Sequence, residues 1–338
     1  MPYIGSWSVV QRSKIWVWWN QPRQLRWLAR FVISCALLAV LFSWIDLQAF
    51  WQAIQRLNWS FFLFSVLLFY PAQLFAAYRW YFLLLQLGLS PAYNLIVRYT
   101  LLGQIAALVL PGQVGGDVVR ALALAQHERQ VAVPVLSVLI DKLTLLFALF
   151  LFALAGLWST TLARFALLFE VTAVLCVLIL FVLVLLCLYR PPIATVRRWT
   201  NQFPVTRKLT PTIQEWVQVP PIPISTLIAL FLLSVLWQII NIIGSYLLAR
   251  AMNIAIAPVD WMALNAMVAL VQILPVSLGG LGVREGAWAA LLALYNVPPA
   301  QSTAFSLISF TAMILLLAFG WAATEWVYPK MLHVARSP

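Results

Sequence analysis

The spacing of charged residues is the feature that most constrains how this chain can fold. Residues 57–78 and 221–249 contain no charged side chain, and each stretch has the roughly 20 apolar residues that a helix needs to cross a membrane. Only 9% of the 338 residues are charged and 64% are apolar or aromatic, whereas soluble domains carry about 25% charged residues. Further apolar stretches complete a bundle of about six crossings, namely 31–45, 131–158, 171–189 and roughly 300–324. The sequence therefore predicts an all-α polytopic membrane protein and excludes a soluble enzyme, a disordered tail and a disulfide scaffold.

Two more apolar stretches, 95–116 and 261–283, are broken by proline and glycine near their ends. The helix-competent part of the first, Tyr99–Leu110, would rise about 18 Å, which is roughly half the thickness of a membrane. A half-length helix that ends in a glycine-rich bend and is followed by another short helix is typical of a re-entrant hairpin. The breaking residues are Pro111, Gly112, Gly115 and Gly116 in the first stretch, and Pro275, Gly279, Gly280 and Gly282 in the second.

The distribution of basic residues favours hairpins over two further crossings. The chain has 21 Lys and Arg against 9 Asp and Glu, a formal net charge of +12, and basic residues collect on the cytoplasmic side of membrane proteins. With six crossings and two hairpins, that side receives both termini, the basic loop 190–208, Arg79 and Arg120. If the first hairpin crossed instead, the basic loop would face outward.

An internal repeat relates the two broken stretches. Residues 111–120 and 275–284 share the pattern P-x-x-x-G-G-x-x-V-R, and the same offset of 164 relates Pro134 to Pro298. We predict a duplication, with units of roughly 57–158 and 221–325. Three crossings separate the starts of the units, so the second is inverted, as in secondary transporters whose broken helices meet near the midplane. The alternative is that proline and glycine only allow close helix packing.

The repeated motif contains the elements of a phosphate site. A helix that restarts after Gly116, with Asp117 as its N-cap, would present free backbone N–H groups, with Arg120 one turn further along. An equivalent helix start near Gly282 would carry Arg284. Glycine lets a ligand approach the backbone, and arginine can donate to two phosphate oxygens; the glycines concerned are Gly115, Gly116, Gly279 and Gly280. Alternatively, Arg120 marks the cytoplasmic surface and Arg284 pairs with an acid such as Glu285.

Two adjacent charges, Asp141 and Lys142, lie about 15 Å into a predicted span. An unpaired charge there costs at least ~2.5–3.5 kcal/mol, and neighbours on a helix point to different sides. We expect Asp141 to face the bundle and to meet Arg120 or Arg284. It could hold the cationic part of a head group, relay a proton, or only compensate a buried arginine, and Glu285 has the same ambiguity. Lys142 is grouped with them as a candidate substrate-binding residue.

The rest of the chain provides membrane contacts and no catalytic constellation. We interpret residues 1–30 as a cytoplasmic, interfacial arm, 31–338 as one transmembrane domain, and the basic connector 190–220 as attracted to anionic lipids. Arg79, followed by Trp80 and Tyr81, is interpreted as an interfacial anchor. Cys35, Cys176 and Cys187 lie in apolar runs and are interpreted as packing residues. We therefore expect no enzyme activity, no cofactor, no metal site and no nucleic-acid partner.

The sequence resembles the transmembrane region of lysylphosphatidylglycerol synthases. The resemblance rests on Leu110–Arg120, on Asp141 and Lys142 in the next span, and on Pro275–Glu285, and it covers the chain from about residue 25 onward. It implies a bacterial inner-membrane flippase for an anionic phospholipid, an aminoacyl-phospholipid or a polyprenyl-phosphate-linked lipid. We expect any lipid-modifying enzyme to be a separate partner. The alternatives are a non-transporting accessory subunit of a lipid- or glycan-modifying enzyme and a small-solute secondary transporter.

Overall fold

The computed structural model describes residues 47–110, 112–157, 166–188, 219, 221–273, 277 and 279–327, and every regular element among them is an α-helix. The predicted arm 1–30, the stretch 31–45, Pro111, Pro275 and most of the connector 190–220 lie outside the described residues. The helices are α4 (Leu47–Gln55), α5 (Trp59–Gln86), α6 (Tyr93–Val109), α7 (Gly112–Glu128), α8 (Ala132–Leu157), α9 (Ala166–Leu188), α12 (Ile224–Ala251), α13 (Pro258–Val271), α14 (Val283–Ala293) and α15 (Pro299–Val327).

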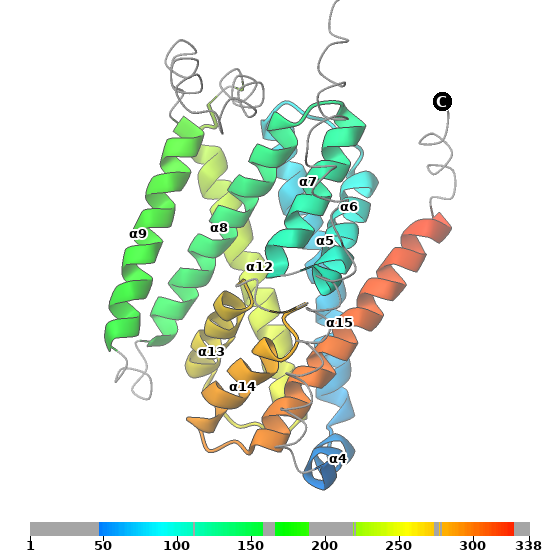
Figure 1. Cartoon of the computed structure of the whole chain (residues 1–338), viewed down its shortest axis with the longest axis vertical. Coiled ribbons are helices and arrows are strands. Elements are labelled where there is room, and N and C mark those ends of the chain that lie inside the picture. The colour runs from blue at the N-terminus through cyan, green and yellow to red at the C-terminus, as the bar shows by residue number, and fades with distance from the viewer. Residues whose placement is uncertain are drawn as a thin grey trace, which may run out of the picture.

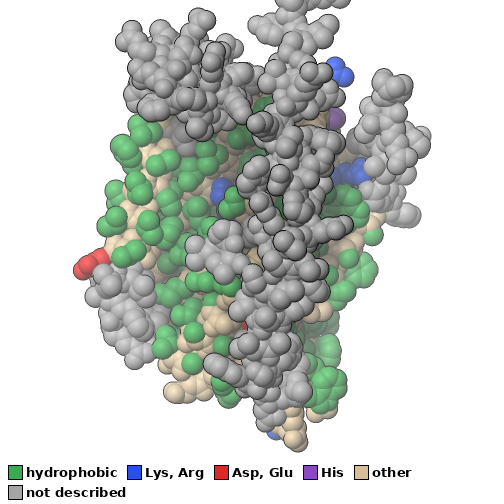
Figure 2. All heavy atoms as spheres, viewed as in Figure 1, with side chains coloured by type: hydrophobic (Ala, Val, Ile, Leu, Met, Phe, Trp, Pro, Cys, Tyr) green, Lys and Arg blue, Asp and Glu red, His purple; other side chains and the backbone are tan. Residues whose placement is uncertain are grey.

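Four of the described helices, α5, α8, α12 and α15, are long and apolar enough to cross a membrane. The apolar segment Glu170–Leu185 of α9 is shorter, as is α13. Large apolar side chains remain exposed on the outside of the bundle, including Phe64, Val177 and Phe319, and Figure 2 shows such side chains covering much of one face. An outer surface of this kind suits lipid, because acyl chains do not penalise exposed apolar groups.

The helices α5 and α12 pack against each other along the centre of the bundle and run in opposite directions. Ser65 Oγ of α5 donates to Gly244 O of α12 at 2.8 Å, whereas Arg79 Nη1, further along α5, donates to Ser234 Oγ, earlier on α12, at 3.2 Å. Residue numbers that rise on one helix while they fall on the other define an antiparallel pair.

Two pairs of shorter helices occupy opposite halves of the molecule (Figure 1). The pair α6 and α7 lies in the upper half, and α13 and α14 lie in the lower half. The last residue before the first connection, Leu110, is extended, with φ −87° and ψ 154°, as expected for a residue that precedes proline. Its carbonyl oxygen accepts a hydrogen bond from the backbone N–H of Gly279 at 3.5 Å. The two connections therefore meet inside the bundle.

The first glycine pair does not form the bend that we predicted. The helix α7 begins at Gly112, so Gly116 and Asp117 lie within it and Asp117 is not its N-cap. A Cβ on Gly116 would overlap with the carbonyl oxygen of Gly103 on α6. At Gly116 the glycine therefore allows two helices to pack closely, while the break between α6 and α7 lies before Gly112.

The second glycine cluster does form a bend. Gly279, Gly280 and Gly282 have φ values of 58°, 73° and 81°, a region that other residues rarely adopt. A Cβ on Gly279 would lie 2.6 Å from the carbonyl oxygen of Leu108. The helix α14 then starts at Val283, with Gly282 at its N-cap, which confirms the predicted restart before Arg284.

Candidate functional site

A cavity of about 310 Å³ lies between the two glycine motifs. Its walls come from both helix pairs, from α5, α8 and α12, and from Met313 of α15. Most of the residues that we predicted for the site line it, namely Gly116, Asp117, Arg120, Asp141, Lys142, Gly279, Gly280 and Arg284. Gly115 and Glu285 do not. The structure thus brings residues 164 positions apart in sequence, such as Arg120 and Arg284, to one cavity.

Asp141 is the centre of a buried ion-pair network. Its side chain is only 1% exposed. Arg79 Nε donates to Oδ1 at 2.8 Å, and Arg120 Nη2 donates to Oδ2 at 2.9 Å. The expectation that Asp141 faces the bundle and meets Arg120 is confirmed, while Arg284 pairs elsewhere. Two arginines on one buried carboxylate leave no oxygen of Asp141 without a charged donor.

Arg79 is a site residue that the sequence analysis misinterpreted. It is 3% exposed and lies inside α5, so the interpretation as an interfacial anchor is wrong. Arg120 is buried as well, which overturns the alternative that it marks the cytoplasmic surface. The guanidinium carbon of Arg79 lies 5.6 Å from the centre of the Trp237 ring. The sequence does contain a signal that Arg79 is buried. The residues from Trp80 to Leu85 are also apolar and therefore place Arg79 within a continuous apolar helix. A charge in that position needs a buried partner of opposite sign.

Arg120 connects Asp141 to the less buried end of the network, at Asp117 and Lys142. Its Nε donates to Asp117 Oδ1 at 3.1 Å, and its guanidinium carbon lies 4.8 Å from the centre of the Trp80 ring. Trp80 is itself held by a hydrogen bond of 2.9 Å to Ser137 Oγ. The side chain of Arg120 therefore has a fixed position, with aromatic contact on one face.

Lys142 is the cation of the cavity that has the weakest internal contacts. Its Nζ lies 3.1 Å from Asp117 Oδ2 and 3.4 Å from Gln113 Oε1. The contact with Asp117 lacks hydrogen-bond geometry, since Oδ2 has no hydrogen-bond partner among the described residues. Three cations (Arg79, Arg120 and Lys142) face two carboxylates (Asp117 and Asp141), so this network has one positive charge in excess.

The second motif is neutral by itself. Arg284 pairs with Glu285, which is fully buried, and its Nε donates to Ser306 Oγ at 3.1 Å. Glu285 Oε2 also accepts from the backbone N–H of Gly282 at 2.6 Å and so stabilises the start of α14. The alternative that Arg284 pairs with Glu285 is confirmed. At the offset of 164, Phe305 stands where the first unit has Asp141, so the second unit has no counterpart of the central carboxylate.

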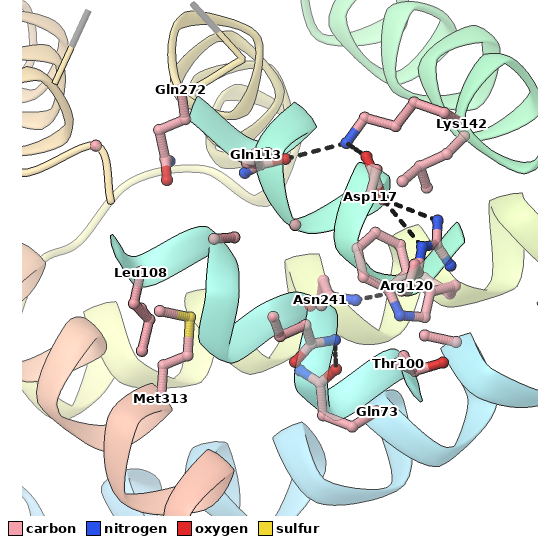
Figure 3. Close-up of a pocket in the computed structure, with 18 of the residues that line it drawn as sticks. Gln73, Thr100, Leu108, Gln113, Asp117, Arg120, Lys142, Asn241, Gln272 and Met313 are labelled. Carbon is pink, nitrogen blue, oxygen red and sulfur yellow. Dashed lines mark hydrogen bonds and ion pairs between the residues drawn. The ribbon is translucent and has the colours of Figure 1, made fainter. Parts of the chain in front are cut away.

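The remaining polar side chains of the cavity are carboxamides and one hydroxyl, which the sequence analysis did not single out. They are Gln73, Thr100, Gln104, Gln113, Asn241 and Gln272. In Figure 3, Asp117, Lys142 and Arg120 lie together, and Gln73 and Asn241 lie near Thr100 below them. Polar residues spaced along apolar helices were the available signal, but their convergence depends on how α5, α6 and α12 pack.

No group of three His, Cys, Asp or Glu side chains that could hold a metal ion occurs among the residues that the structure describes. Cys176 and Cys187 are buried, and Cys35 lies outside the described part of the chain.

These features define a multi-pass helical membrane protein with a buried, positively charged cavity. The family model for the lysylphosphatidylglycerol synthase TM region matches residues 27–320. The chain belongs to this family, as the sequence motifs predicted, and it is therefore a membrane protein tied to lipid biology. No curated protein and no solved structure matches it.

Proposed function

We propose that the protein is a lipid translocase of the bacterial inner membrane that moves a phosphate-bearing lipid between leaflets. The observation that carries the proposal is the cavity of about 310 Å³ at the meeting point of the two connections, with one excess positive charge in its ion-pair network. A phosphodiester carries one negative charge, so its head group would neutralise the network. A non-transporting accessory subunit needs no such cavity, and the cavity therefore favours translocation.

The contacts between helices support an inverted repeat. If α5–α8 correspond to α12–α15, each contact should have a counterpart with the units exchanged. The contact of α8 with α13 then corresponds to that of α15 with α6, and the contact of α7 with α8 corresponds to that of α14 with α15; all four occur. The helices α5 and α12 correspond to each other in this exchange, and they pack against each other as an antiparallel pair. Two units of opposite orientation, each with a re-entrant hairpin, suit alternating access from the two faces.

The orientation follows from the basic connector. If residues 190–208 lie in the cytoplasm, in accordance with the excess of basic residues there, both termini lie there too. The pair α6 and α7 then opens toward the cytoplasmic leaflet, and α13 and α14 open toward the outer one. The first of the six crossings would come from residues 31–45, and α9 would be the fourth.

The ion-pair network suggests how a phosphate would be held. Asp117 accepts from Arg120 and lies against Lys142, so it occupies the side of both cations that a phosphate oxygen would approach. The phosphate replaces Asp117 at Lys142, while Asp141 continues to hold Arg79 and Arg120. The acyl chains stay in the surrounding lipid. The proposal assigns no covalent step to this chain, and its partners are the anionic lipid and, where the lipid is modified, a separate enzyme.

Lys142 tests the proposal because its removal breaks no hydrogen bond to a carboxylate. We expect Lys142→Gln to slow transbilayer movement of phosphatidylglycerol at least about tenfold, since a hydrogen bond to a charged group contributes ~1.5–3 kcal/mol. The measurement is the accessibility of a tail-labelled phosphatidylglycerol to an impermeant quencher in proteoliposomes. Lys142→Arg should keep most of the rate.

Arg250→Gln provides the matched control, because Arg250 is an exposed cation at the end of α12 and does not line the cavity. Its rate should equal that of the unchanged protein. Equal rates for Lys142→Gln and Arg250→Gln would contradict the assignment of the cavity as the phosphate site.

A further inference from the structure

The cavity has two chemically different parts. One contains the ion pairs around Asp141. The other is neutral, and its polar groups come from three separate helices: Gln73 of α5, Thr100 and Gln104 of α6, and Asn241 of α12. Gln73, Thr100 and Asn241 line the same cavity as Arg120, and in Figure 3 Thr100 and Gln73 lie on the side of Arg120 that faces away from Lys142. A ligand whose phosphate lies at Lys142 and Arg120 would therefore have its next atoms against carboxamides and a hydroxyl.

Each carboxylate in the charged part is already paired with a cation of the protein. Two carboxylates line the cavity among the described residues, and both are committed: Asp141 to Arg79 and Arg120, and Asp117 to Arg120 and Lys142. Glu285 is paired with Arg284 and lies off the cavity. Asp117 stays paired with Arg120 when a phosphate replaces it at Lys142, so an ammonium group buried here would lose its hydration and find no carboxylate without a cationic partner.

The neutral part of the cavity has hydrogen-bond donors and acceptors that are not used within the described structure. Gln104 Nε2 donates to Gln73 Oε1, and Asn241 Nδ2 donates to Trp237 O at 2.8 Å. Each carboxamide has two donors and one carbonyl acceptor, so these bonds leave the Gln73 amide group and the Gln104 and Asn241 oxygens able to bind a ligand. The hydroxyl of Thr100, a residue that is only 5% exposed, has no hydrogen-bond partner among the described residues. A buried hydroxyl without a partner is costly, which points to a partner supplied by a ligand.

We infer that the transported lipid carries a neutral, hydroxylated head group on its phosphate, as in a glycerol or sugar phosphodiester, and not an aminoacyl or other cationic one. The inference rests on the proposed function and names its substrate class. Hydroxyl groups both donate and accept, so they can pair with carboxamide oxygens and amide groups alike. The volume of about 310 Å³ lies at the small end of the range for ligand pockets and suits a compact head group.

The test compares tail-labelled lipids in the quencher assay with the full-length protein. The arms are phosphatidylglycerol, a hexosyl polyprenyl phosphate, phosphatidic acid, which has no head group beyond its phosphate, and lysyl-phosphatidylglycerol. We expect one of the first two lipids to move at least about fivefold faster than the last two, and the faster of the two identifies the source of the hydroxylated group. If lysyl-phosphatidylglycerol moves as fast as any other lipid, translocation stands and the inference is wrong. If no lipid moves faster than in protein-free vesicles, the proposed function fails, and the inference fails with it.

Thr100→Val isolates the neutral part, because it keeps the shape of the side chain and removes a hydroxyl that has no hydrogen bond in the described structure. We expect it to slow the preferred lipid about two- to thirteenfold, the effect of losing one hydrogen bond of ~0.5–1.5 kcal/mol, and to leave phosphatidic acid unchanged. The double variant Gln73→Leu/Gln104→Leu removes both partners of the carboxamide pair, so that neither is left buried alone. It should also slow the preferred lipid and leave phosphatidic acid unchanged. Gln126→Leu, at an exposed position of α7, is the control. Equal slowing of phosphatidic acid and the preferred lipid would overturn the inference.

Discussion

Replacing Asp141 with alanine is expected to destabilise the protein by about 3–5 kcal/mol, the usual cost of removing one partner from a buried ion pair. Asp141 is the shared partner of Arg79 and Arg120 and is 1% exposed. Without it, Arg79 has no carboxylate partner among the described residues and keeps its hydrogen bond to Ser234, whereas Arg120 keeps its ion pair with Asp117. The two buried guanidinium groups then lose the carboxylate that they share.

The measurement is thermal unfolding of the purified protein in detergent, followed by tryptophan fluorescence. Glu170→Gln is the control, because it removes an exposed carboxylate from α9 and should change stability by less than about 0.5 kcal/mol. Arg79→Met should cost less than Asp141→Ala, since Asp141 keeps Arg120. The double variant Arg79→Met/Asp141→Ala should be more stable than the sum of the single effects predicts. If the Asp141→Ala protein had the same melting temperature as the Glu170→Gln control, the description of Asp141 as the centre of the network would be contradicted.

Gly116→Ala is expected to have an effect of comparable size through a different cause. An alanine Cβ at this position would overlap with the backbone carbonyl oxygen of Gly103 and would crowd Ala107 at 2.9 Å. Backbone atoms cannot rotate away as a side chain can, so α6 and α7 must separate. The cost should reach or exceed the upper end of the ~1–3 kcal/mol usual for overpacking. Because Arg120 lies one turn further along α7, the separation should also displace the ion pairs and slow transport.

Gly286→Ala is the matched control for this change. Gly286 also lies inside a helix, α14, but a Cβ there would meet no atom within 4 Å. The same substitution should therefore stabilise the protein by about 0.5–1 kcal/mol, because alanine loses less conformational freedom than glycine in a helix. Opposite signs for the two variants in the same unfolding experiment are the expected result. Equal melting temperatures would mean that α6 and α7 do not pack closely at Gly103 and Gly116.

The apolar stretches predicted the five longest described helices, because the length of a charge-free apolar segment is a local property of the chain. Residues 57–78, 131–158, 171–189, 221–249 and 300–324 correspond to α5, α8, α9, α12 and α15. Boundaries were less accurate where a charge is buried. The charge-free stretch 57–78 ends before Arg79, whereas α5 continues to Gln86, because Asp141 supplies a counter-charge that the sequence does not show.

The glycine motifs show the same limit. The two copies of P-x-x-x-G-G-x-x-V-R predicted equal bends, but the glycines of the first copy are helical and those of the second have positive φ. Glycine permits both a left-handed turn and the close approach of another helix. Which of the two occurs depends on what lies opposite, Gly103 in the first case and Leu108 in the second.

The sequence by itself determined the class of the protein, its long helices and the family. It also narrowed the partner of Asp141 to Arg120 or Arg284, because charge in an apolar segment must be compensated and few compensating residues exist. Only the tertiary structure decided that Arg79 completes this network and that Glu285 neutralises Arg284. It also decided that Gln73, Thr100, Gln104 and Asn241 converge on one cavity. These residues come from helices far apart in sequence, and the way those helices cross is set by the packing of whole surfaces rather than by any local pattern.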